Sequence, residues 1–116
     1  MEIIESRIGQ TSVLALSGAL DTSSASTLTE QAVALCDAGI RTILIDLDQV
    51  SYMTSAGFRS FIAINRRAEQ SGIGMALCGL NELVHELFEV SGLLGSFRIY
   101  PDRASALEAT GQQRTP

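Results

Sequence analysis

The sequence predicts a single α/β domain with a mixed β-sheet, an N-terminal β-hairpin and about four helices, in the order ββαβαβαβα. Two apolar runs separated by a short turn open the chain, which indicates an antiparallel pair. Strand-like runs then alternate with helix-like segments, an arrangement typical of parallel strands joined by helices. The 116 residues fit one domain, which we expect over 1–110, with 111–116 as a flexible C-terminal tail.

The N-terminal part is predicted to form two strands and a helix. The first strand, indicated by three isoleucines within residues 3–8, ends at Gly9-Gln10, and the second covers Ser12–Ser17. Asp21 or one of the three hydroxyl residues after it caps the helix by accepting from its free N–H groups. Gly39 ends this helix. The helix has one apolar face, formed by Ala25, Leu28, Ala32, Leu35 and Cys36.

The central strand is expected over Arg41–Asp48, because the run Ile43–Ile45 is apolar on both faces and marks a strand in the middle of a sheet. The chain then turns at Tyr52-Met53 and enters a second helix after Ser55. Gly72 ends that helix. Its apolar face is expected at Phe58, Phe61, Ile62 and Ala68, and Arg59, Arg66 and Arg67 are expected to lie mostly on the opposite face.

Two more strands and two more helices are predicted in the C-terminal part. Strand Ile73–Cys78 is followed by a helix that Asn81 caps and Gly92 ends. A short last strand covers Phe97–Tyr100, and Asp102 then caps a final helix. The first of these helices holds Leu83, Val84, Leu87 and Phe88, and the second runs through Ala104 and Leu107.

The composition excludes several classes of function. A formal net charge of −5 argues against nucleic acid or an anionic membrane surface as a direct partner, because both attract basic patches. The apolar runs are too short to span a bilayer. The acidic, alternating start Met1–Glu5 does not resemble a signal peptide, and two cysteines do not make a disulfide framework. We therefore expect a cytoplasmic protein with reduced thiols.

The chemistry-bearing residues form no catalytic or metal-binding motif. His85 is the one histidine, is predicted on the exposed side of its helix, and has no metal-ligand spacing to Cys36 or Cys78, which are expected to be packed. Ser55 has neither a Gly-x-Ser-x-Gly context nor an obvious base. The glycines of Gly72-Ile73-Gly74 precede their strand and lack nucleotide-binding spacing. We expect no metal and no cofactor.

A pair of acids keeps an enzymatic alternative open. Asp46 and Asp48 are two residues apart on a strand and point to the same face if the strand is regular there. Near a strand end, such acids are more often solvated or bonded to loop N–H groups. A small enzyme that uses these two acids and Ser55 remains a hypothesis, which a deep pocket lined by all three side chains would favour.

The turn Thr54–Gly57 combines two hydroxyls with two small residues after the central strand. One of the hydroxyls is expected to cap the second helix. The carboxyl ends of such strands are also where α/β sheets bind ligands and partners. Ala56 and Gly57 are small enough for another protein to approach Ser55 closely. Because a helix N-terminus stabilises an anion, Ser55 can be phosphorylated without unfolding the domain.

Four motifs follow one another along the chain: Gly18–Asp21, Ile45–Val50, Tyr52–Phe58 and Phe97–Leu107. With them, the sequence resembles the STAS domains, and among these the bacterial anti-sigma factor antagonists. The first three are similar to the family's Gly-x-Leu-Asp, Asp-Leu-x-x-Val and Phe-Met-Asp-Ser-Ser/Ala-Gly-Leu motifs. The resemblance covers nearly the whole chain and implies one STAS-like domain.

This resemblance implies a non-catalytic switch. In the family, the unphosphorylated domain binds an anti-sigma factor, usually a serine kinase, and thereby frees a sigma factor. Phosphorylation of the serine that Ser55 matches dissociates the complex, and a PP2C-type phosphatase restores binding. Thr54 stands where the family commonly has an acid. This departure removes a negative charge from the surface and makes Thr54 the alternative modified hydroxyl.

The resemblance also implies a partner-binding surface around Asp21 and the Ser55 turn, and it leaves an alternative kind of partner open. Asp21 is expected to lie near the Ser55 turn. An alternative within the same family is a STAS subunit of a lipid-transport ABC complex or of a stress-signalling assembly. The residues implied for partner binding are Asp21, Thr22, Thr54, Ser55, Ala56, Gly57 and Arg59.

Overall fold

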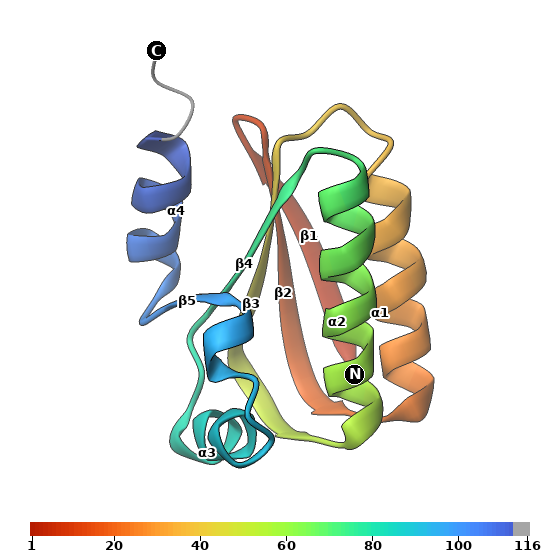
Figure 1. Cartoon of the computed structure of the whole chain (residues 1–116), viewed down its shortest axis with the longest axis vertical. Helices are drawn as coiled ribbons and strands as arrows, with labels where there is room; N and C mark the ends of the chain where they lie inside the picture. The colour runs from red at the N-terminus through yellow and green to blue at the C-terminus, as the bar shows by residue number, and fades with distance from the viewer. Residues whose placement is uncertain (113–116) are drawn as a thin grey trace.

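The computed structural model describes residues 1–112 and confirms the predicted order ββαβαβαβα, with one short 3-10 helix added before the last strand (Figure 1). Its strands are β1 (Glu2–Ile8), β2 (Thr11–Leu20), β3 (Thr42–Met53), β4 (Gly74–Cys78) and β5 (Arg98–Tyr100). Its helices are α1 (Thr22–Leu35), α2 (Ser55–Gln70), α3 (Glu82–Val90), η1 (Leu94–Ser96) and α4 (Arg103–Gln112).

The sheet is mixed, and its strands follow the order β1-β2-β3-β4-β5. The opening pair β1–β2 is antiparallel, and all other neighbours are parallel. Ile8 pairs with Thr11, so the hairpin turn is the predicted Gly9-Gln10. Gly9 has φ 60, a left-handed backbone that glycine adopts without strain, and this geometry suits a two-residue hairpin.

Helices cover both faces of the sheet, but unequally. Figure 1 shows α1 and α2 side by side on one face and α4 alone on the other. The larger core lies under α1, α2 and α3. Four phenylalanines pack there with ring centroids 5.0 to 6.4 Å apart, namely Phe58, Phe61, Phe88 and Phe97. The smaller core lies under α4 and contains Val13, Leu44, Ala76, Cys78 and Ala106.

The central strand is longer than the sequence predicts. A turn was expected at Tyr52-Met53, but this prediction is wrong, because β3 continues through both residues. β2 also runs past Ser17 and supplies the partners: Ala19 pairs with Tyr52, and Leu20 pairs with Met53. Two register shifts between β2 and β3 interrupt the regular alternation of side chains that would have marked the strand.

The predicted caps are present at three helices. Asp21 caps α1 and forms a capping box with Ser24. The Asn81 side chain accepts from the Val84 N–H at 2.8 Å at the start of α3. Asp102 accepts from the Ser105 N–H at 2.7 Å at the start of α4. Each cap satisfies a backbone N–H that has no partner inside its helix.

The C-terminal helix α4 extends to Gln112, two residues into the expected tail. The other four residues of that tail, 113–116, lie outside the described part of the chain. Within residues 1–112, no helix is both long enough and apolar enough to cross a membrane.

Candidate functional site

The turn between β3 and α2 lies directly beside the end of β2. The Thr54 N–H donates to the Leu20 carbonyl at 3.0 Å, and the Thr54 hydroxyl donates to the same oxygen at 3.4 Å. Asp21 follows Leu20 and begins α1. The start of α1 and the start of α2 are therefore adjacent, as expected, and Asp21 lies near the Ser55 turn.

Four of the predicted partner-binding residues are exposed around this junction: Asp21, Thr22, Ser55 and Arg59. Thr54 is half-buried beneath them. These five residues come from the N-terminal ends of two neighbouring helices and one connecting turn, and we call them the switch surface.

Ala56 and Gly57, the other two predicted residues, are buried. A Cβ atom at Gly57 would lie 2.9 Å from Leu20 Cδ2 and 3.2 Å from Met53 Cε. Glycine therefore lets α2 approach the ends of β2 and β3 closely. These two small residues shape the switch surface from below, and because they are buried they offer little exposed area to a partner.

The start of α2 has no side-chain cap, which contradicts the expectation that Thr54 or Ser55 provides one. The Thr54 hydroxyl turns to the Leu20 carbonyl, so it does not accept from the N–H groups of the first helical turn. The Ser55 hydroxyl forms no hydrogen bond with any described residue, and the first turn of α2 contains no acid. Ser55 thus presents a free hydroxyl beside uncapped N–H groups.

Asp21 adds a negative charge to the switch surface. Hydrogen bonds from the backbone N–H and the hydroxyl of Ser24 hold the pKa of the Asp21 carboxyl below its ordinary value of 3.8. The role of Ser24 was missed by the sequence analysis, although Asp21 and Ser24 have the spacing of a capping box. Asp21 is therefore a fixed carboxylate at neutral pH.

The acid pair Asp46 and Asp48 lies elsewhere, beside the start of α4. The buried Asp46 carboxylate accepts from the Asp48 N–H at 3.0 Å and from Arg103 Nε at 2.9 Å. Both acids line a hollow of about 250 Å³ with Gly79, Pro101, Asp102 and Arg103, and Ser55 is not among its lining residues. This hollow therefore lacks the arrangement that would favour an enzyme, in which Ser55 lines one pocket together with both acids.

The remaining chemistry-bearing residues lie where the sequence predicts them. His85 is exposed on α3, and Cys36 and Cys78 are buried. Burial raises the pKa of both thiols, that of Cys78 to about 12. No group of three or more His, Cys, Asp or Glu within residues 1–112 could hold a metal ion.

The chain matches known proteins over nearly its whole length. The model of the STAS domain family matches residues 3–106. A Bordetella bronchiseptica protein that carries the name of an anti-sigma factor antagonist, BtrV, is 29% identical over 109 residues, which cover 94% of each chain. The crystal structure of a Thermotoga maritima protein, also named as an anti-sigma factor antagonist, superimposes with a TM-score of 0.85 at 19% identity and covers 92% of each chain.

A second solved structure is the anti-sigma factor antagonist SpoIIAA in its unphosphorylated form. It has a TM-score of 0.75 at 16% identity and covers 99% of this chain and 100% of its own. At these identities, the two structures establish likeness of fold alone. The family match settles the class: this chain belongs to the STAS domain family.

Proposed function

We propose that this protein is an anti-sigma factor antagonist of the cytoplasm, without enzymatic activity of its own. It binds an anti-sigma factor of the serine-kinase type through the switch surface and thereby releases a sigma factor. The observation that carries the proposal is the exposed Ser55 hydroxyl, free of hydrogen bonds to described residues and adjacent to Asp21. Such a hydroxyl is open both to a partner and to a kinase.

Phosphorylation of Ser55 is the proposed off-switch. A phosphate adds about −1.5 to −2 charges at neutral pH. At the N-terminus of α2, the uncapped N–H groups and the helix dipole stabilise that charge, so the fold is retained. In a close interface, the phosphate would have to lose its water and would lie beside the Asp21 carboxylate. A loss of about 3 kcal/mol by this route weakens binding roughly a hundredfold.

Arg59 connects the two states of the proposed switch. It is exposed and lies four residues after Ser55, so both side chains emerge on one side of α2. Without phosphate, its guanidinium is available to an acidic group of the partner. With phosphate, it can pair with the modified Ser55 instead, which removes a cation from the docking surface. A PP2C-type phosphatase would reverse the change.

The test is a titration of Ser55 variants with the anti-sigma factor. Ser55→Ala should keep the affinity of the wild type, because no hydrogen bond of the described fold depends on that hydroxyl, whereas Ser55→Asp should weaken binding at least tenfold. Isothermal titration calorimetry measures both. Thr54→Val, which removes the alternative modified hydroxyl, is the matched control for in vitro phosphorylation. Equal affinities of wild type and Ser55→Asp for the anti-sigma factor would contradict the proposed switch. Co-purification of this protein with a membrane ATPase would instead indicate a transporter subunit.

A further inference from the structure

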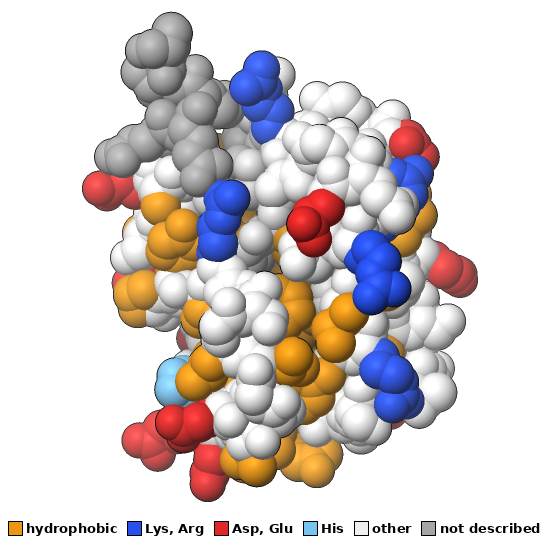
Figure 2. Space-filling view, viewed as in Figure 1, with side chains coloured by type: hydrophobic (Ala, Val, Ile, Leu, Met, Phe, Trp, Pro, Cys, Tyr) orange, Lys and Arg blue, Asp and Glu red, His pale blue; other side chains and the backbone are white. Residues whose placement is uncertain are grey.

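The arginines of this acidic chain are unevenly distributed. All eight basic residues are arginines. Three of them form ion pairs with acids: Arg7 with Glu5, Arg67 with Asp37 and Arg103 with Asp46. Within the described part of the chain, four exposed arginines have no such partner, and Figure 2 shows basic side chains gathered on the face that α2 and β5 share. These four are Arg41, Arg59, Arg66 and Arg98.

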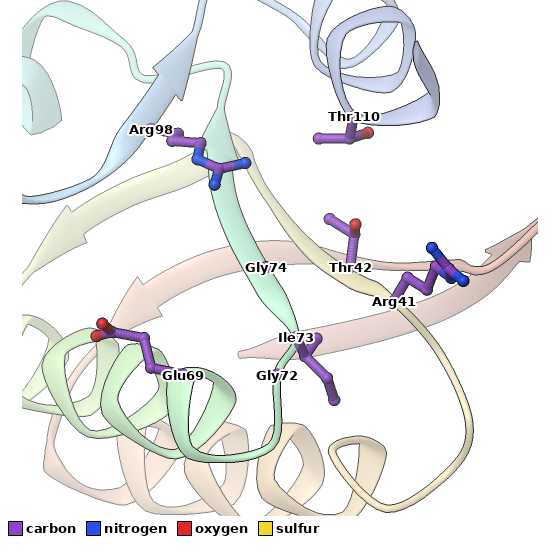
Figure 3. A pocket seen from close by; sticks show the side chains of 8 residues that line it. All are labelled: Arg41, Thr42, Glu69, Gly72, Ile73, Gly74, Arg98 and Thr110. Carbon is purple, nitrogen blue, oxygen red and sulfur yellow. The ribbon is translucent and has the colours of Figure 1, made fainter. Parts of the chain in front are cut away.

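A groove runs across the same face. It consists of three adjoining hollows of about 670, 430 and 260 Å³, and each shares several lining residues with the next. The groove begins between α2 and the segment from Leu93 to Phe97, and it continues past Arg98 to Arg41 at the start of β3. Figure 3 shows its wider end, with Arg98 over β4 and Arg41 on the far side of Thr42. We call it the arginine groove.

The lining of the arginine groove is amphipathic. Apolar side chains contribute to its walls, namely Ile62, Ile73, Leu93 and Phe97. Arg41, Arg66 and Arg98 provide three positive charges along it, and Glu69, which borders all three hollows, provides one negative charge. The groove thus has a formal charge of +2 on a chain whose net charge is −5.

We propose that the arginine groove binds an acidic, amphipathic segment of a partner protein. Carboxylates of that segment would pair with the free guanidinium groups, and its apolar side chains would cover Leu93 and Phe97. Because Glu69 borders all three hollows, we expect the bound segment to place a basic or amide side chain next to the Glu69 carboxylate. Nucleic acid fits less well, because Glu69 repels phosphates and the overall charge is negative. Figure 3 shows the two arginines of the wider end apart, which suits an extended segment better than one small anion.

The arginine groove is separate from the switch surface, although both use α2. With a rise of 1.5 Å per residue, Ile62 lies about 10 Å along the helix from Ser55, and Glu69 about 20 Å. Charges that far apart at an exposed surface are largely screened at physiological ionic strength, where the Debye length is about 8 Å. Binding in the groove should therefore be insensitive to phosphorylation of Ser55, and its test is independent of the proposed sigma-factor switch.

The experiment is an NMR titration of the ¹⁵N-labelled full chain with a synthetic peptide in which glutamates alternate with leucine, phenylalanine and one central glutamine. We expect shift changes at groove residues such as Asn65 and Gly95 and unchanged signals at Asp21 and Ser55. The double variant Arg66→Gln/Arg98→Gln should bind about tenfold more weakly, since each exposed ion pair contributes only a few-fold. Ser55→Asp should bind like the wild type.

Arg67→Gln is the matched control, because Arg67 lies on the same helix, carries the same charge and already pairs with Asp37. An equal loss of affinity in this control would overturn the proposal in favour of a net-charge effect. Equal binding of a peptide with lysines for glutamates, or of an oligonucleotide or inorganic phosphate at the same residues, would overturn the assignment to an acidic segment. Chemical-shift changes at groove residues on dilution of the protein without peptide would assign the groove to a second copy of this chain. If the peptide causes no shift changes at the groove residues, the proposal is refuted.

Discussion

At the scale of single residues, the hydrogen bond of the Thr54 hydroxyl decides whether the N–H groups at the start of α2 are capped. The Thr54 side chain donates to the Leu20 carbonyl and so leaves the start of α2 without a cap. Ser55, the next residue, is exposed. Local sequence could not reveal this arrangement, because a cap at Thr54 or Ser55 is equally compatible with the residue types. The carbonyl of Leu20 lies 34 residues away in the chain and is brought there by the pairing of β2 with β3.

Cys78 gives a prediction at the same scale. It is fully buried under α4, and burial, with the nearby Asp46 carboxylate second, raises its pKa from 9.0 to about 12. Between these values, the folded state holds a proton that the unfolded state has lost, so stability falls as pH rises, by roughly 1.4 kcal/mol per pH unit. Below pH 9.0, both states are protonated and this contribution is complete.

Urea unfolding at several alkaline pH values measures this slope, and Cys78→Ala should reduce it. A thiol reagent should label Cys78 only after unfolding, because the protonated, buried sulfur is a poor nucleophile. Fast labelling of Cys78 in the native protein would contradict the prediction.

At the scale of elements, α2 carries both proposed surfaces. Ser55, Arg59, Ile62 and Arg66 recur at intervals of three or four residues and form one stripe along the helix. The opposite stripe, with Phe61, Ile64 and Ala68, is buried. The helical period of the apolar residues predicted the buried positions of Phe61 and Ala68, because it depends on local spacing alone. Ile62, which was expected on the apolar face, lies half-buried on the stripe of the arginines instead.

The uncapped start of α2 leads to a prediction for Thr54. Thr54→Asp should stabilise the protein by about 1 kcal/mol, because a carboxylate at this position accepts from the first-turn N–H groups and complements the helix dipole. Thermal unfolding followed by circular dichroism measures the change. Thr54→Asn is the control, since it supplies a cap without the charge. Destabilisation by both variants would mean that the bond from Thr54 to the Leu20 carbonyl contributes more than a cap.

At the scale of the whole molecule, two layers of helices are joined through the sheet. Packing of Ala106 and Leu107 and the ion pair from Arg103 to the buried Asp46 fix α4 to its face. The sequence predicted α4 and the strand that bears Asp46, but it could not pair residues 57 positions apart. The length of β3 was also underestimated from the sequence, because the length of a strand depends on how far its neighbouring strands extend. The fold was otherwise predictable, since apolar periodicity and caps mark most of its elements.

The link between layers can be tested with Asp46→Ala. This change removes the acceptor of the Asp48 N–H and leaves Arg103 without its carboxylate, so we expect a loss of about 2 kcal/mol. Urea unfolding gives the free energy, and faster hydrogen exchange in α4 should accompany it. Asp37→Ala, which breaks the exposed pair with Arg67, should cost less than about 1 kcal/mol. Equal losses in the two variants would indicate that packing alone holds α4.

The strand order β1-β2-β3-β4-β5 has a consequence for how the chain is made. Each strand pairs with the one synthesised just before it, so the sheet can grow at one edge while the chain leaves the ribosome, and no strand has to be inserted between two others. The helix α4 is made after all five strands. Until it docks, Val13, Leu44, Ala76 and Cys78 lie open to water on one face of a sheet that is otherwise complete. The greatest exposure of this apolar face to chaperones and proteases therefore falls between the pairing of β5 and the docking of α4.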